Sequence, residues 1–243
     1  AGAGGIDIAM LVIAANEGVM PQTREHLAIL NLLSVSRGVI ALTKKDLVDE
    51  EWLDLVRLEV EELLKGTTLA DAPIVPVSSV TREGIPELLT TIDRLLDSTE
   101  SRKDKGRPRL PIDRVFSIAG AGTVVTGTLI DGTLASGQEV EIIPSGIKSR
   151  LRGLQTHRSQ VTVASPGSRV AANLTGVTTA QVQRGDILTK PGWLRPTTLV
   201  SARLHVLADA RYPLKNNAER QVYVLAAEAT VQIRLLDAEE LKP

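Results

Sequence analysis

Short apolar runs alternate with helical spacings of apolar residues through the first 98 residues, and this alternation most constrains the fold. The runs predict strands at residues 6–15, 38–42 and 73–77. Between and after them, leucine, isoleucine and valine recur every three or four residues, which predicts helices that begin near Pro21, residue 50 and Pro86. Repeated strand–helix units form parallel sheets with helices on both faces. We therefore predict a doubly wound α/β domain over residues 1–98, with the strand at 6–15 covered on both faces.

The period of the apolar pattern changes to two after residue 110. Alternating runs separated by Gly, Pro, Asp and Ser predict an antiparallel barrel or sandwich of six or seven strands over residues 111–194. Three further runs, LVSARLHVL, RQVYVLAAE and TVQIRLLD, predict the start of a second β-barrel over residues 195–243. The predicted fold class is therefore α/β plus all-β.

A charged stretch separates the α/β part from the first barrel. Residues 99–110 contain SRKDKGRPR, which is poor in apolar residues and is interpreted as an interdomain linker. Its net basic charge leaves open a second interpretation, in which the stretch faces a polyanion.

Composition excludes several classes of protein. The chain has no cysteine, which excludes disulfides and thiolate metal sites and favours a reducing, cytoplasmic compartment. Its three histidines lack the spacing of metal ligands, and no apolar run approaches the about 18 residues of a membrane span. The formal net charge of −1 argues against a protein that coats nucleic acid over its whole surface. Because the chain starts without methionine close to a strand pattern, we expect it to be part of a longer protein.

The turn after the strand at 38–42 carries a candidate base-recognition motif, Thr43-Lys44-Lys45-Asp46. In open α/β sheets, ligands bind at the carboxyl ends of the strands. The Asp46 carboxylate can accept two hydrogen bonds from the N1–H and 2-amino groups of guanine, a pair that adenine does not offer. Lys44 can lay its methylene stem along the base while its ammonium stays hydrated. Alternatively, Asp46 caps the helix that starts near residue 50.

A second polar loop follows the strand at 73–77. Parallel strands end at the same edge of a sheet, so Ser78 and Ser79 are expected to share the crevice with Asp46. The backbone N–H of Ser79 can approach the guanine O6, and the Ser78 hydroxyl can brace Asp46. The alternative is that both serines cap a following turn. Two loops of suitable chemistry at neighbouring strand ends favour a purine site.

Longer stretches resemble the elongation factors among the translational GTPases. AGAGGIDIAMLVIAANEGVMPQTREHL is similar to the middle of their GTPase domain, TKKD to their guanine-recognition motif, and Ser78-Ser79-Val80 to their second guanine loop. Elongation factor Tu has Asn at the position of Thr43. IDRVFSIAGAGTVVTGT, residues 112–128, looks like the opening of their barrel domain. The resemblance implies that the guanine of GTP or GDP is held by Thr43, Lys44, Asp46, Ser78 and Ser79.

The chain lacks the other half of that family's nucleotide site. Neither a phosphate loop nor the D-x-x-G-H stretch with the catalytic histidine is present, and both would precede Ala1. Phosphoryl transfer is catalysed by the part of a site that holds the phosphates, Mg²⁺ and water. We therefore expect Mg²⁺ only in the full-length protein, no catalytic residue in this chain, and no GTP hydrolysis by these 243 residues alone.

Within the group, the sequence most resembles the selenocysteine-specific elongation factors. Thr43, IDR at 112–114, RGLQTH, PGSR and QRGD carry this resemblance. It implies a monomer that binds selenocysteyl-tRNA and the ribosome, with a messenger hairpin bound only by a carboxy-terminal region absent from this chain. It also implies that Asp113, Arg114 and Arg169 contact the selenocysteyl group. A selenolate is anionic near neutral pH and serine is neutral, so guanidinium donors would discriminate between them.

Alternatives stay open at the barrel and for the chain as a whole. Asp113 is expected to orient Arg114, but the two can equally form an ordinary strand-end ion pair, with Arg169 an exposed strand residue. The chain could carry ordinary aminoacyl-tRNAs in the manner of elongation factor Tu, against which Thr43 and the Asp113–Arg114 pair argue. It could also be a non-catalytic tRNA- or ribosome-binding module, against which its abrupt start argues.

Overall fold

The computed structural model describes residues 6–99, 104–207, 210 and 212–242. The chain forms two compact units, one of residues Ile6–Ser101 and one that contains Arg102–Pro243.

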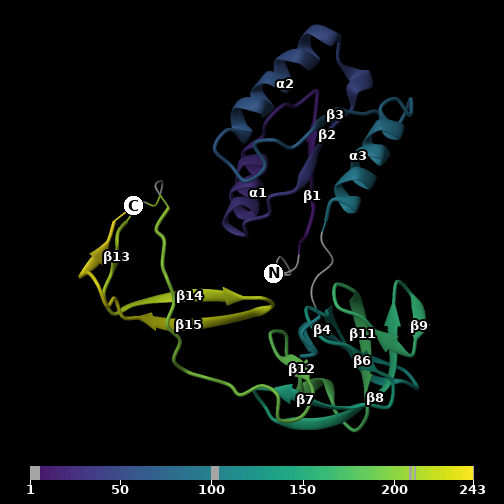
Figure 1. Ribbon diagram of the computed structural model, residues 1–243, viewed down its shortest axis with the longest axis vertical. Coiled ribbons are helices and arrows are strands. Elements are labelled where there is room, and N and C mark those ends of the chain that lie inside the picture. The colour runs from purple at the N-terminus through teal and green to yellow at the C-terminus, as the bar shows by residue number, and fades with distance from the viewer. Residues whose placement is uncertain (1–5, 100–103, 208–209, 211, 243) are drawn as a thin grey trace. The chain divides into compact units, whose positions relative to one another are not determined.

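The first unit is a parallel sheet between two layers of helices (Figure 1). Strands β1 (Ala9–Ala14), β2 (Gly38–Thr43) and β3 (Ile74–Pro76) lie side by side in that order, and both pairings are parallel. Helices α1 (Pro21–Leu32) and α2 (Glu50–Leu64) cover one face, and α3 (Ile85–Asp97) covers the other. The predicted βα architecture is confirmed.

Strand β2 has a continuous apolar sequence because both of its faces are buried. Ile40 and Leu42 belong to the core that also contains Val60 and other residues of α2. Val39 packs with Val75 on the opposite face, against apolar side chains of α3. All residues from Gly38 to Leu42 are buried, which makes β2 the centre of the sheet.

Strand β1 departs from the prediction that it is covered on both faces. Leu11 and Ile13 are buried under α1 and α2, whereas Met10 and Val12 are 53% and 55% exposed. The reason is that α3 packs over β2 and β3, so within the described residues nothing covers that face of β1. The prediction was wrong for Met10 and Val12.

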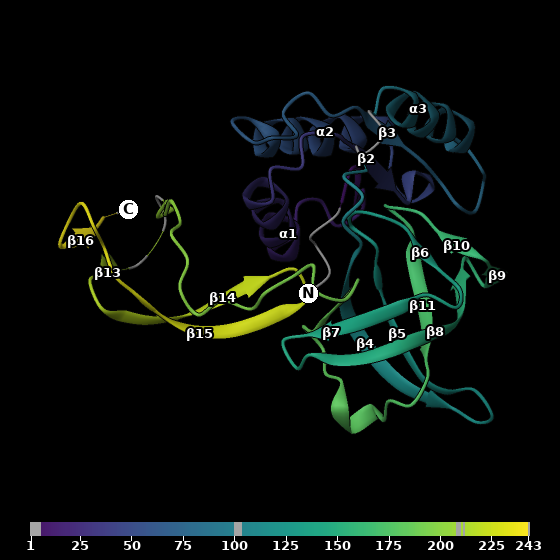
Figure 2. The same ribbon diagram turned by 60° about the horizontal axis from the view of Figure 1, so that its bottom comes forward.

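The second unit contains a closed antiparallel barrel of six strands, which confirms the predicted all-β part (Figure 2). The strand order is β11-β5-β4-β12-β7-β8, and pairing of β8 with β11 closes the barrel. The barrel strands are β4 (Arg109–Ile118), β5 (Gly122–Thr128), β7 (Glu139–Ile143), β8 (Ile147–Thr156), β11 (Arg169–Leu174) and β12 (Ile187–Thr189). β9 (Ser159–Val161) pairs with β8, and β6 (Leu134–Ala135) pairs with β10 (Val163–Ala164). Inward side chains such as Leu110, Val125 and Leu154 are almost completely buried.

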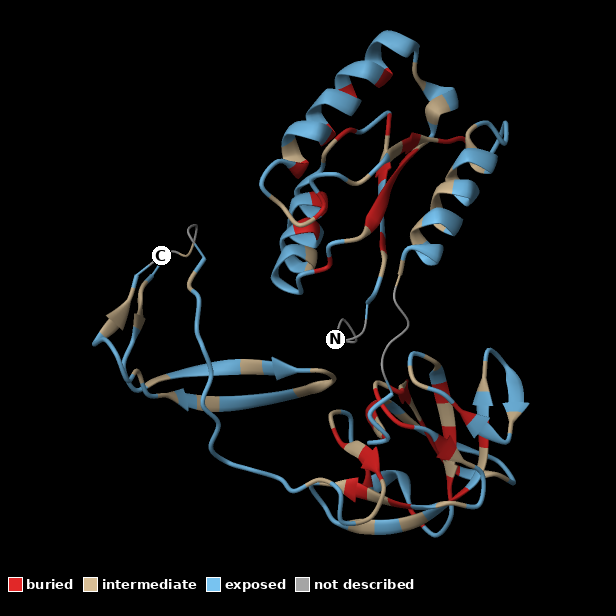
Figure 3. Ribbon diagram, viewed as in Figure 1, coloured by how far each residue is buried: buried red, intermediate tan, exposed pale blue. Residues whose placement is uncertain are grey.

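The segment after the barrel forms two small antiparallel pairs, and two of the three strands predicted there are present as β14 (Ala218–Val224) and β15 (Ala227–Ile233). β13 (Leu214–Lys215) pairs with β16 (Glu240–Leu241), and β14 pairs with β15. The strand predicted over residues 199–207 is absent from the structure as described, because no neighbouring strand hydrogen-bonds with it there. None of the described residues beyond 190 is buried (Figure 3). That this segment begins a second barrel stays a prediction.

Gly127 and Gly153 provide a matched test of the barrel's packing. A Cβ atom on Gly127 would clash with the carbonyl oxygen of Pro111 on the paired strand β4, whereas a Cβ atom on Gly153 meets nothing within 4 Å. We expect Gly127→Ala to lower the free energy of unfolding by about 1–3 kcal/mol. Gly153→Ala should change it by less than about 0.5 kcal/mol. Urea unfolding followed by circular dichroism measures both, and equal effects would contradict the predicted clash.

Candidate functional site

The loops after β2 and β3 lie side by side at the carboxyl ends of these strands. The Val77 N–H donates to the Leu42 carbonyl at 2.8 Å, and the Lys45 N–H donates to the Val77 carbonyl at 3.2 Å. An ion pair between Lys45 and Glu83 adds a side-chain link between the loops. The two polar loops therefore share one edge of the sheet, as the parallel strands required.

Asp46 is free to bind a ligand. It lies in the short 3₁₀ helix η1 (Lys45–Leu47), is exposed, and makes no hydrogen bond or ion pair with the described residues. Helix α2 is capped by Asp49 instead, whose Oδ1 accepts from the Trp52 N–H at 2.8 Å. An N-cap side chain accepts from a backbone N–H two or three residues later, and only Asp49 is placed for this. The alternative that Asp46 caps this helix is wrong.

Lys44 is held by contacts from the neighbouring strand end. Its backbone is in the left-handed region, at φ +58°, a conformation that costs a non-glycine residue roughly 1–2 kcal/mol. Its ammonium donates to Glu17, in the turn after β1, at 2.7 Å. The preceding Thr43 hydroxyl donates to the Ile13 carbonyl on β1 at 3.3 Å. Glu17 was missed by the sequence reasoning, although an acidic residue in the turn after the first strand was a visible signal.

The two serines have different environments. Ser78 is buried, and its hydroxyl oxygen accepts from the N–H groups of Val80 at 3.2 Å and Thr81 at 3.0 Å. The expected brace from Ser78 to Asp46 is therefore wrong, and the turn-capping alternative is correct for this hydroxyl. Ser79 is exposed, and its N–H is bonded to no described group. Ser78 thus shapes the turn in which the Ser79 N–H stays available.

On the barrel, Asp113 pairs with Arg169 and not with Arg114. The guanidinium of Arg169 binds the carboxylate in a bidentate manner, at 2.7 and 3.0 Å, and the Thr126 hydroxyl donates to Asp113 Oδ1 at 2.8 Å. Asp113 is the extra residue of a bulge in the β4–β5 register, which interrupts the alternation of side chains between Ile112 and Arg114 and leaves the carboxylate on the outer side of the barrel, where Thr126 and Arg169 bind it. Arg114 is exposed and has no hydrogen-bond or ion-pair partner among the described residues.

The environment of Asp113 stabilises its charged form. Partial burial opposes ionisation, but the hydrogen bonds from Arg169 and Thr126 and the charges of Arg169 and Arg114 outweigh it, so the pKa of the Asp113 carboxyl is lowered. Near neutral pH, the site therefore contains one ionised carboxylate and two guanidinium groups.

A groove of about 590 Å³ lies on the same outer face of the barrel. Ala171 and Asn173 line it and project to the same side of β11 as Arg169, because side chains alternate along a strand. Phe116 and Ile118 of β4 supply large apolar groups. The sequence reasoning missed this groove, although Phe116 is the single phenylalanine of the chain.

The described residues contain neither a cluster of metal-ligating side chains nor a helix that could span a membrane. No group of three or more histidine, aspartate or glutamate side chains in these ranges is arranged to hold a metal ion. No helix formed by these residues is both long enough and apolar enough to cross a membrane.

Comparison with protein families identifies both folded parts. Residues 1–98 match the elongation factor Tu GTP binding domain, and residues 122–189 match elongation factor Tu domain 2. The chain belongs to the translational GTPases of the elongation factor Tu type. Within this family it is similar to the selenocysteine-specific factors.

The relatives are longer than this chain. A selenocysteine-specific elongation factor of Desulfomicrobium baculatum is 45% identical over 242 residues, an alignment that covers 100% of this chain, to the nearest per cent, and 38% of the relative. The crystal structure of a bacterial selenocysteine-specific elongation factor superposes with a TM-score of 0.80 at 30% identity, over 98% of this chain and 40% of that one. The factor SelB of Methanococcus maripaludis, in complex with the GTP analogue GppNHp, superposes with a TM-score of 0.74 at 26% identity, over 98% and 57%.

The lowered pKa of Asp113 can be measured directly. The carboxyl should titrate below its ordinary value of 3.8, so the ion pair stabilises the fold above that pH and is lost as the pH falls through the lower value. Arg169→Gln removes the bidentate pair and the positive charge, and should raise the midpoint toward 3.8. Carbon-detected NMR of the carboxyl measures it. Arg150→Gln, which removes an exposed ion pair with Glu139, should leave the midpoint unchanged, and the same shift in both variants would contradict this cause.

Proposed function

We propose that this chain is the guanine-recognising and aminoacyl-binding part of a GTP-dependent elongation factor that delivers selenocysteyl-tRNA to the ribosome at recoded UGA codons in the cytoplasm. The observation that carries the proposal is a free Asp46 carboxylate and a free Ser79 N–H on two loops tied together by hydrogen bonds. The 45% identity with a selenocysteine-specific factor supports the choice of cargo.

The donor and acceptor set fits guanine. Asp46 accepts from the N1–H and 2-amino groups, Ser79 donates to O6, and the methylene stem of Lys44 covers the base while Glu17 holds its ammonium. Thr43 and Ser78 hold the two loops in shape. Bound GTP supplies the phosphoanhydride whose hydrolysis drives the cycle of such factors. No residue of this chain is proposed to hold the phosphates or Mg²⁺.

The barrel provides a charged end and an apolar groove for an aminoacyl end. Arg114 is free to bind an anion, and Arg169 is oriented by its bidentate pair with Asp113. A hydrogen bond from a charged group contributes about 1.5–3 kcal/mol. One guanidinium contact with a selenolate is therefore sufficient for tenfold or greater discrimination against the neutral hydroxyl of serine. The groove beside Phe116 and Ile118 accommodates the apolar faces of the adenosine that carries the amino acid.

Asp46→Asn in the full-length factor tests the guanine site. The amide no longer accepts both guanine donors, so GTP affinity should fall about 100-fold, while xanthosine triphosphate, which presents an oxygen in place of the 2-amino group, should bind better than GTP. Competition with a fluorescent guanine nucleotide measures both affinities. Asp49→Asn is the control, because asparagine is an equally good N-cap and Asp49 holds helix α2. If the Asp46→Asn variant still binds GTP better than xanthosine triphosphate, the proposed guanine site is wrong.

Replacing Arg114 and Arg169 with alanine tests whether these residues select selenocysteyl-tRNA. In the full-length factor, the double variant should bind selenocysteyl-tRNA at least tenfold more weakly and seryl-tRNA with little change, because only the selenolate requires the guanidinium groups. Arg150→Ala, an exposed arginine elsewhere on the barrel, is the charge control. Equal losses for the two tRNAs would mean that these arginines contact only the RNA backbone.

A further inference from the structure

The basic stretch at residues 105–109 is bonded to the barrel that follows it. The Lys105 N–H donates to Asp131 Oδ1 at 2.8 Å, and the Thr189 hydroxyl donates to the Pro108 carbonyl at 2.7 Å. Arg109 pairs with Asp131 through both backbones and through an ion pair of 3.5 Å. The backbone of residues 105–109 is therefore part of the barrel surface, and Arg109 is held there by its ion pair.

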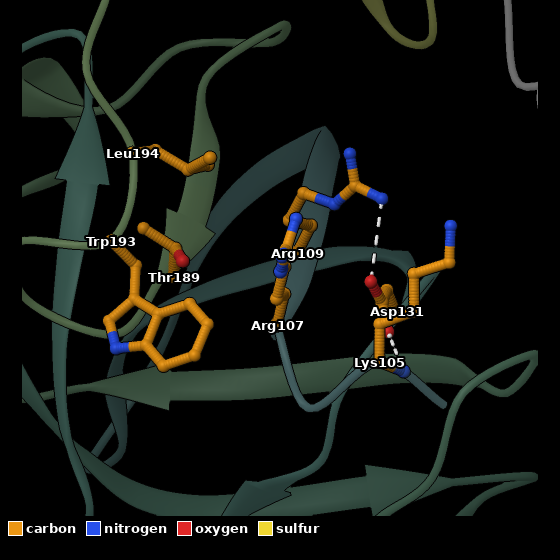
Figure 4. A pocket seen from close by; sticks show the side chains of 7 residues that line it. All are labelled: Lys105, Arg107, Arg109, Asp131, Thr189, Trp193 and Leu194. Carbon is orange, nitrogen blue, oxygen red and sulfur yellow. Dashed lines mark hydrogen bonds and ion pairs between the residues drawn. The ribbon is translucent and has the colours of Figure 1, made fainter. Parts of the chain in front are cut away.

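These residues form one side of a polar pocket of about 500 Å³ (Figure 4). Trp193 lies on one side of the pocket, and Lys105 and Asp131 lie on the other, with Arg107 and Arg109 between them. The lining residues carry a net charge of +2. The pocket shares no lining residue with the groove beside Arg169, and it is remote in sequence from the guanine loops.

The charged groups of this pocket differ in whether they already have a bonding partner. Asp131 is 4% exposed and binds the backbone N–H groups of Lys105 and Gly132 as well as Arg109, so its carboxylate is shielded from a ligand. The Lys105 ammonium and the Arg107 guanidinium have no hydrogen-bond or ion-pair partner within the described residues. Two unneutralised cations that line one pocket attract an anion.

Trp193 adds an aromatic surface to these cations. Trp193 is 49% exposed, so its indole is accessible to a ligand. The Lys190 ammonium lies 5.8 Å from the centre of its ring and adds a further positive charge. An exposed aromatic ring beside unpaired cations is the combination that binds the base and the phosphate of single-stranded nucleic acid.

We propose that this pocket binds one unpaired nucleotide of an RNA strand, whose base stacks on Trp193 and whose phosphate is bound by Lys105 and Arg107. The volume suits a single nucleotide, and a base can stack on Trp193 only when it is unstacked from its neighbours in a helix. Asp131 is a positioning residue that holds Arg109 and the backbone of Lys105. This site is independent of the guanine site, so either can fail without the other.

Trp193 fluorescence reports binding directly once Trp52 is replaced. In the 243-residue chain carrying Trp52→Phe, a 5′-phosphorylated hexamer of adenylate should quench the emission, and the same sequence in a duplex should not. By anisotropy of the labelled hexamer, Trp193→Ala should weaken binding about tenfold, and Trp193→Phe should restore most of it. Arg107→Gln should weaken binding severalfold and reduce the salt dependence of log K by about 0.7.

Arg158→Gln is the matched control, because Arg158 is an exposed arginine at the tip of the β8–β9 hairpin of the same barrel. It should bind the hexamer like the parent chain. Equal losses in Arg107→Gln and Arg158→Gln, or no loss in Trp193→Ala, would overturn the proposal. Binding of AMP as tight as that of the hexamer would also overturn the proposal, because it would indicate a site for free nucleotides. Displacement of the hexamer by an equal concentration of a polyglutamate peptide would overturn it as well.

Discussion

The candidate nucleotide site depends on the parallel pairing of β2 with β3. Their hydrogen bonds continue one step past the strands, from Val77 to Leu42 and from Lys45 to Val77, and so join the two polar loops. Without this pairing, Asp46 and Ser79 would be separated by more than thirty residues of chain. The pairing is stable because β2 is buried on both faces, between α1 and α2 on one side and α3 on the other.

The barrel positions its groups by a different constraint, which is closure. Because β8 pairs with β11, every inward side chain is enclosed, and the outward side chains of β4, β5 and β11 form a continuous surface. The bulge at Asp113 interrupts the regular alternation at one point and brings that carboxylate to Arg169 and Thr126. The same barrel also holds residues 105–109, so a stretch that resembles a linker becomes a cationic surface of defined shape.

Sequence patterns predicted the strands and helices well where local periodicity decides the outcome. The buried strand at 38–42, the helices that begin at Pro21 and near Glu50, and most barrel strands follow from spacing alone. Predictions failed where a partner distant in the sequence decides. Met10 and Val12 are exposed because α3 lies over other strands, and residues 199–207 form no strand because none pairs with them in the described chain.

By itself, the sequence determined which chemical groups are available and on which loops they lie: one carboxylate and one small-residue turn after neighbouring strands, and arginines on an all-β part. Tertiary structure decided which of these groups are already used. Asp49 rather than Asp46 caps α2, the Ser78 hydroxyl binds its own turn, and Asp113 binds Arg169 rather than its neighbour Arg114. The physical reason is that a hydrogen bond depends on the distance and direction between two groups. Sequence spacing determines both within a helix or a strand, but only the packed fold determines them between elements.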